Sequence, residues 1–228
     1  MQITKQKDLE NILNGMADVL RHNGPKSTVQ DKVGRFLQCA YGLFGSWKGR
    51  LNQILSGGYN VDQFLSLFED FLNECNNGSW SQMSRHKGEI AKYKESLFSS
   101  VKQLFSARDN INSTITILRD VTEYSSPNKI RGVTPFILSG ILFAYDEDNF
   151  MILDKPVLEY FGLKDYKQAL SEYKSIIKIS KDYSTKFNLS MWYINKGYGI
   201  LSHQSKLDVK KLCRKCRSEN FVYSFKWP

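Results

Sequence analysis

Apolar residues recur along most of this chain at intervals of three and four, which is the spacing of one buried face of an α-helix. Asn-Gly-Pro at 23–25 and Ser-Gly-Gly at 56–58 interrupt the pattern, as residues that end helices do. The apolar faces predict helices over 9–20, 27–40, 61–72, 97–105, 111–121, 166–177 and 189–194.

The segment 111–117 is ambiguous, because Ile-Asn-Ser-Thr-Ile-Thr-Ile alternates apolar and polar residues as a strand does. The same isoleucines also fit a four-residue repeat, which favours a helix. Repeated alternation bounded by turns is found nowhere, and the chain has no internal repeat. We therefore predict an all-α, multi-helix protein with subdomains at 1–76 and 81–201 and a C-terminal tail at 202–228. The loop-like Asn-Asn-Gly-Ser sequence at 76–79 is the candidate boundary between the subdomains, and it equally suits a connector within one domain.

Composition narrows the class of protein. The chain has 228 residues, 41% of them hydrophobic, and 32 lysines and arginines against 23 acidic residues give a net charge of +9. This excess indicates an acidic partner, with nucleic acid first and an anionic membrane surface second. The longest apolar stretch, near 136–145, is too short to span a bilayer. The N-terminus lacks the apolar core that a secretory signal peptide requires. We expect a soluble, cytoplasmic protein without a membrane partner.

The most informative segment is 128–163. Ser-Ser-Pro before it ends a helix, and a tight turn containing Gly132 leads to Pro135, which suits the first position of the next helix. A turn of this kind presents free backbone N–H groups at a helix N-terminus, where a phosphate oxygen can bind. Lys129 and Arg131 would add positive charge beside it.

This turn, Ile-Arg-Gly-Val-Thr-Pro, resembles the helix-hairpin-helix turn of DNA repair glycosylases, usually Leu-Pro-Gly-Val-Gly. The resemblance implies that the amides of Gly132 and Thr134 contact a DNA phosphate. It also implies that Asp154, which ends the apolar stretch Met-Ile-Leu-Asp, occupies the place of the catalytic aspartate. Phe136 stands where bifunctional members carry a lysine nucleophile, so any activity would be monofunctional N-glycosidic bond hydrolysis. Thr134 replaces the second glycine of the motif.

The same segment is similar to all-helical domains associated with restriction and defence ATPases, because they share a sequence like Leu-Asp-Lys-Pro-Val around Asp154. That likeness implies a bacterial defence or restriction role, with an ATPase or nuclease on a partner chain. Asp154 also has a purely structural interpretation, because aspartate before Lys-Pro is a favourable N-cap worth about 1 kcal/mol. A cap and a catalyst do not exclude each other.

The tail at 202–228 carries seven basic residues against two acidic ones, followed by alternating aromatic residues from Phe221 to Trp227. It suits nucleic-acid binding, a solvated basic surface or a protein-docking segment. Its candidate DNA contacts are Lys210, Lys211, Arg214, Lys215 and Arg217. Cys213 and Cys216 supply only half of a zinc ribbon, so we expect no metal.

The leading hypothesis is a non-catalytic helix-hairpin-helix-type module that binds duplex or single-stranded DNA. One alternative is a monofunctional DNA glycosylase that uses Asp154, and another is a protein–protein adaptor with a basic tail. The chain has no nucleotide-binding loop, dinucleotide fingerprint or nucleophile elbow, and we expect no cofactor.

Overall fold

The computed structural model describes residues 2–21, 47–74 and 87–204, and within these ranges the regular structure is entirely helical. This confirms the all-α prediction. The helices are α1 (Gln2–Arg21), α3 (Trp47–Leu55), α4 (Val61–Glu74), α6 (Lys87–Ala91), α7 (Lys94–Ser106), α8 (Ile111–Thr122), α9 (Pro135–Tyr145), α10 (Lys155–Phe161), α11 (Tyr166–Ser171), α12 (Tyr173–Phe187) and α13 (Met191–Gln204).

The ambiguous segment 111–117 is helical. Asn110 caps α8, because its side chain accepts hydrogen bonds from the backbone N–H groups of Asn112 and Ser113. The single helix predicted over 166–177 is wrong in one respect. The helix is interrupted at Glu172, which is the C-cap of α11 and the N-cap of α12, with φ −96° and ψ 3°. The predicted helix over 27–40 lies outside the described residues.

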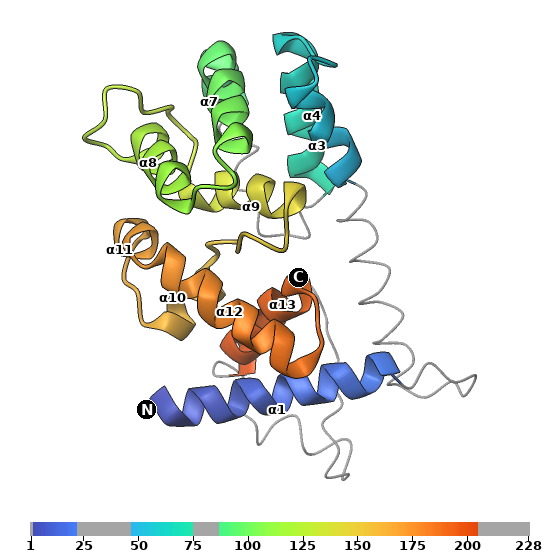
Figure 1. Ribbon diagram of the computed structural model, residues 1–228. Helices are drawn as coiled ribbons and strands as arrows, with labels where there is room; N and C mark the ends of the chain where they lie inside the picture. Colours follow the sequence, from blue (N-terminus) through green and yellow to red (C-terminus); the bar gives the residue numbers. More distant parts are fainter. Residues whose placement is uncertain (1, 22–46, 75–86, 205–228) are drawn as a thin grey trace.

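Two apolar helices form the centre of the structure (Figure 1). All residues of α9 except Phe136 are buried, and α3, α7 and α8 pack around this helix. Most of α13 is also buried, and α1, α10 and α12 pack around it. A helix that is apolar on all sides must be covered on all sides, so the sequence of α9 already requires this central position.

Helix α1 lies across α13 at short range. A Cβ atom at Gly197 would lie 2.7 Å from Cδ2 of Leu13, which shows how closely the two helices approach. Helix α3 packs instead on α9, so the helices within 1–76 contribute to both halves of the core. The short helix predicted over 189–194 is wrong in its bounds, because α13 begins at Met191 and continues to Gln204. It also buries Ser202, which had been assigned to the tail. The boundary near 77–80 lies outside the described residues and stays a prediction.

A buried segment without regular secondary structure, 150–153, lies between α9 and α10 in the chain. The hydroxyl of Tyr173 donates to the carbonyl oxygen of Met151 at 2.7 Å and accepts from its backbone N–H at 3.3 Å. The hydroxyl of Ser139, on α9, accepts from the N–H of Leu153 at 2.9 Å. These side chains satisfy backbone groups that have no strand partner, so the segment is buried without unpaired polar atoms at these positions.

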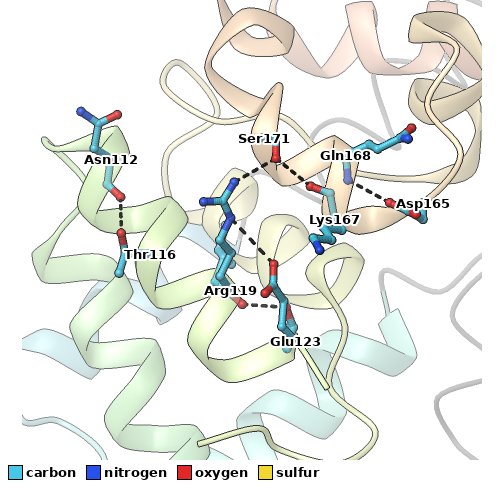
Figure 2. A network of polar contacts seen from close by, with 10 residues as sticks. Asn112, Thr116, Arg119, Glu123, Asp165, Lys167, Gln168 and Ser171 are labelled. Atoms are coloured by element: carbon cyan, nitrogen blue, oxygen red, sulfur yellow. Dashed lines mark hydrogen bonds and ion pairs between the residues drawn. The ribbon is translucent and has the colours of Figure 1, made fainter. Parts of the chain in front are cut away.

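A polar network connects α8 to α11 (Figure 2). The Arg119 guanidinium donates to the Ser171 hydroxyl at 3.0 Å and lies 3.8 Å from the Glu123 carboxylate. The Ser171 hydroxyl in turn donates to the carbonyl oxygen of Lys167 at 3.1 Å. This network fixes the C-terminal end of α8, where the loop with the sequence-predicted binding residues begins.

Candidate nucleic-acid interface

The loop at 123–134 connects α8 to α9 along the outer side of the molecule (Figure 1). Gly132 has φ +86°, a conformation that costs other residues about 1–2 kcal/mol. Thr134 is the N-cap of α9 and accepts from the N–H of Ile137 at 3.4 Å, and Pro135 is the first residue of the helix. The predicted glycine turn and proline helix start are therefore present.

Hydrogen bonds within the loop hold its shape. The Asp120 carboxylate accepts from the Ser126 hydroxyl at 2.6 Å and from the Asn128 amide at 2.9 Å. The N–H of Ile130 donates to the carbonyl oxygen of Val121 at 2.9 Å, and the Ile130 side chain is fully buried. A loop ordered in this way loses little conformational entropy when a ligand binds.

The Lys129 side chain is directed back toward the C-terminal end of α8. Its ammonium donates to the carbonyl oxygen of Thr122 at 2.7 Å and lies 3.7 Å from the centre of the Tyr124 ring. Partial burial lowers the pKa of Lys129. A positive charge at the C-terminal end of α8 is favourable in its own right, so Lys129 has a structural explanation that requires no phosphate.

The outer side of the loop carries the remaining predicted contacts. Arg131 is exposed, and Gly132 and Thr134 are partly exposed. The N–H groups of Ile137 and Leu138, in the first turn of α9, donate to the hydroxyl and the carbonyl oxygen of Thr134. In the part of the chain that the structure describes, the N–H groups of Gly132 and Thr134 donate to no acceptor. Both belong to the same turn as Arg131.

Asp154 caps α10, accepting from the N–H of Val157 at 3.0 Å, which confirms the capping interpretation. Burial raises the pKa of its carboxyl to about 6, although the residue as a whole keeps partial exposure. The amide of Asn195 and the ammonium of Lys196, both on α13, oppose this rise in pKa. Tyr166 is also near, and its pKa is raised by burial and then by the Asp154 charge.

The Asn195 side chain is 3% exposed, and its Nδ2 atom forms no hydrogen bond of normal geometry with the described residues. The amide is nevertheless close enough to the Asp154 carboxylate to favour its charged form, so we take the two groups to interact. The cluster thus combines a carboxyl that titrates near neutral pH with buried polar neighbours, which is an arrangement that can accept a proton.

Two hollows in the described surface are lined by residues outside the loop at 123–134 and outside the surroundings of Asp154. One of about 610 Å³ lies between α7 and α8 and includes Phe98, Ala107 and Ile117, and another of about 350 Å³ lies beside Arg108 and Tyr145. Neither includes Asp154. A glycosylase needs a pocket for the flipped base at its catalytic carboxylate, so these hollows do not favour that chemistry.

The described ranges are almost neutral, with 21 lysines and arginines against 20 aspartates and glutamates. Most of the net charge of +9 therefore belongs to the remaining residues. Lys210, Lys211, Arg214, Lys215 and Arg217 are among them and lie outside the described residues.

Within residues 2–21, 47–74 and 87–204, histidine, cysteine and acidic side chains form no group of three or more that could hold a metal ion. None of the helices described there is both long and apolar enough to cross a membrane.

Sequence reasoning missed three residues that the fold places at these features. Tyr124 is 94% exposed on the loop, and Asn195 and Tyr166 adjoin Asp154. An aromatic residue directly after a helix end and before Ser-Ser-Pro was a usable signal for Tyr124, because such turns lie at the surface. The other two come from distant helices and gave no local signal.

Comparison with protein-family models, with curated proteins and with solved structures returned no match for this chain. The resemblance to helix-hairpin-helix proteins therefore stays a prediction from residues 128–163.

Proposed function

We propose that this protein binds DNA through the sugar–phosphate backbone, with the loop at 123–134 fixing the position of a phosphate. One observation carries the proposal: the N–H groups of Gly132 and Thr134 lack acceptors among the described residues and belong to the same turn as the exposed Arg131. Backbone amides and an arginine are a common donor set for phosphate oxygens. Contacts of this kind position a protein on DNA but read no sequence.

Asp120 is an acidic residue that contacts this loop, and its carboxylate is already engaged by loop donors. Both carboxylate oxygens of Asp120 accept hydrogen bonds from within the loop, from Ser126 and Asn128. The donors are therefore held by an ordered scaffold, and Arg131 is exposed although the neighbouring Ile130 is fully buried.

Affinity and position come from different parts of the chain in this proposal. Because the described ranges are nearly neutral, they supply little long-range attraction for DNA. The basic tail, with Lys210, Lys211 and Arg214 among its cations, supplies most of it through counterion release. We expect weak dependence on base sequence and steep dependence on salt.

The salt dependence is measured by fluorescence anisotropy with a labelled 20-base-pair duplex, on the full chain and on a chain that ends at Gln204. This end point retains Ser202, which is buried and hydrogen-bonded to Glu159. The slope of log K against log salt should fall by roughly 3 to 6 on truncation, since each phosphate contact contributes about 0.9. Absence of binding by the full chain at about 50 mM salt would refute the proposal.

The loop is tested by Arg131→Glu, with Lys174→Glu on the exposed side of α12 as a control of equal charge change. We expect Arg131→Glu to weaken binding at least tenfold, because it places a carboxylate beside the phosphate site, and the control to have a much smaller effect. Equal effects of the two variants would assign the affinity to net charge alone. If neither variant weakens DNA binding and the protein still captures a protein partner, the adaptor alternative is favoured.

The raised pKa of the Asp154 carboxyl is the one observation that favours the glycosylase alternative. Its test uses duplexes that carry uracil, oxoguanine, alkylated or methylated bases, followed by alkaline cleavage. Cleavage by the wild type that is abolished in Asp154→Asn would support a catalytic role, and product that is undiminished in this variant would exclude Asp154.

A further inference from the structure

Tyr124 is the most exposed large apolar or aromatic residue among the described residues whose side chains are placed, at 94%. The other exposed apolar or aromatic side chains are Leu55, Ile179 and Tyr93, at 37–38%. A single aromatic side chain at the surface is common, but these other three retain most of their contact with the protein. Tyr124, in the loop at 123–134, therefore differs from them in having little contact with the protein.

The ring is held on one side only. The Lys129 ammonium lies 3.7 Å from the ring centre, and the same ammonium is fixed by its hydrogen bond to the carbonyl oxygen of Thr122. A cation–π contact of this kind orients a tyrosine without covering it. The opposite ring face remains open to solvent, as the exposed fraction of 94% requires.

The same short loop thus presents three kinds of group: two backbone N–H donors, the guanidinium of Arg131, and a flat aromatic face. Phosphate recognition uses the first two. An aromatic face beside a phosphate site is the other component of proteins that bind unpaired strands, in which a base stacks on the ring while the backbone is held nearby.

We propose that Tyr124 stacks on an unpaired DNA base, and that the loop therefore prefers single-stranded or locally opened DNA to an intact duplex. This inference rests on the proposed function, since it adds a base contact to the same phosphate site. In a duplex the base faces are covered by their neighbours, and only unpaired bases offer a face to the ring.

The test compares three labelled probes: a 20-nucleotide oligothymidylate, the same backbone with abasic spacers in place of all bases, and the duplex of oligothymidylate with oligodeoxyadenylate. The wild type should bind the thymidylate strand roughly 5- to 150-fold more tightly than the abasic strand, the range for one stacked base. A difference below about twofold would overturn the stacking role.

Variants separate the ring from other parts of the protein. Tyr124→Ala should lose most of the preference for bases, and Tyr124→Phe should retain it, because phenylalanine keeps the ring face. Tyr93→Ala, which removes the exposed tyrosine between α6 and α7, should bind like the wild type. Thermal unfolding followed by circular dichroism checks that Tyr124→Ala is folded, as expected for a side chain with so few contacts.

The two proposals fail in different ways. If the wild type binds none of the three probes, DNA binding itself is refuted. If the wild type binds and Tyr124→Ala retains the full preference for bases, only the stacking role of Tyr124 is refuted. An equal loss on all three probes in Tyr124→Ala would also refute it, since an abasic strand has nothing to stack.

Discussion

Replacing Asp154 with asparagine should stabilise this protein at neutral and higher pH. The pKa of the Asp154 carboxyl is raised from 3.8 to about 6, chiefly because burial penalises the charged form. The folded chain therefore holds this proton more tightly than the unfolded chain does. The wild type loses stability as the pH rises from about 4 to 6, and above that range the whole penalty is present.

The magnitude follows from the size of the shift. Each pKa unit corresponds to 1.36 kcal/mol, so the charged carboxyl costs up to about 3 kcal/mol above pH 6. Asparagine caps helices about as well as aspartate, so Asp154→Asn keeps the hydrogen bond from the N–H of Val157 and removes the charge. The variant should gain most of this free energy at pH 8 and almost none at pH 4.

Urea unfolding followed by circular dichroism between pH 4 and pH 8 measures the difference. The matched control is Asp165→Asn, because Asp165 caps α11 through the N–H of Gln168 at 2.8 Å but is exposed. The control should change stability by less than about 0.5 kcal/mol. An Asp154→Asn variant that is less stable than the wild type at pH 8, or whose advantage does not depend on pH, would refute the reasoning.

Two further predictions concern the packing of the core. Tyr173→Phe removes the hydroxyl that satisfies both backbone groups of Met151, and should lower the free energy of unfolding by about 2–3 kcal/mol in urea titrations. Gly197→Ala places a Cβ 2.7 Å from a leucine of α1 and should destabilise by about 1–3 kcal/mol. The control on the same helix is Gly199→Ala, because a Cβ atom at that position would have no heavy atom within 4 Å. This variant should be neutral or stabilising in the same urea titrations. Equal effects of the two glycine substitutions would contradict the close approach of α1 to α13.

A carboxyl kept at a cost in stability is informative about function. Structural capping alone would be served equally well by asparagine or serine without the penalty of a buried charge. The pH profile of Asp154→Asn therefore bears on both candidate roles of this residue, since a stabilised variant with lost activity would be typical of a functional group.

The helices of this protein were predictable because their signals are local. The periodic apolar faces of α4, α7 and α8 lie within single segments. The cap at Thr134 was not predicted, but the cap at Asp154 was, because it depends on a residue only three positions away. The turn at Gly132 was predictable for the same reason, because a positive φ favours glycine. The break at Glu172 was not, since the buried Leu170 and Tyr173 continue a helical spacing across it.

The roles of individual side chains were decided by tertiary contacts. Sequence placed Lys129 beside a phosphate, but the fold directs its ammonium to the end of α8 and onto Tyr124. The pKa of Asp154 depends on burial and on Asn195, a residue 41 positions away. The sequence by itself determined the helical segments that have periodic apolar faces and the cap at Asp154, because those interactions reach only a turn or two. Exposure, charge burial and the neighbours of each polar group were set only when distant helices packed together.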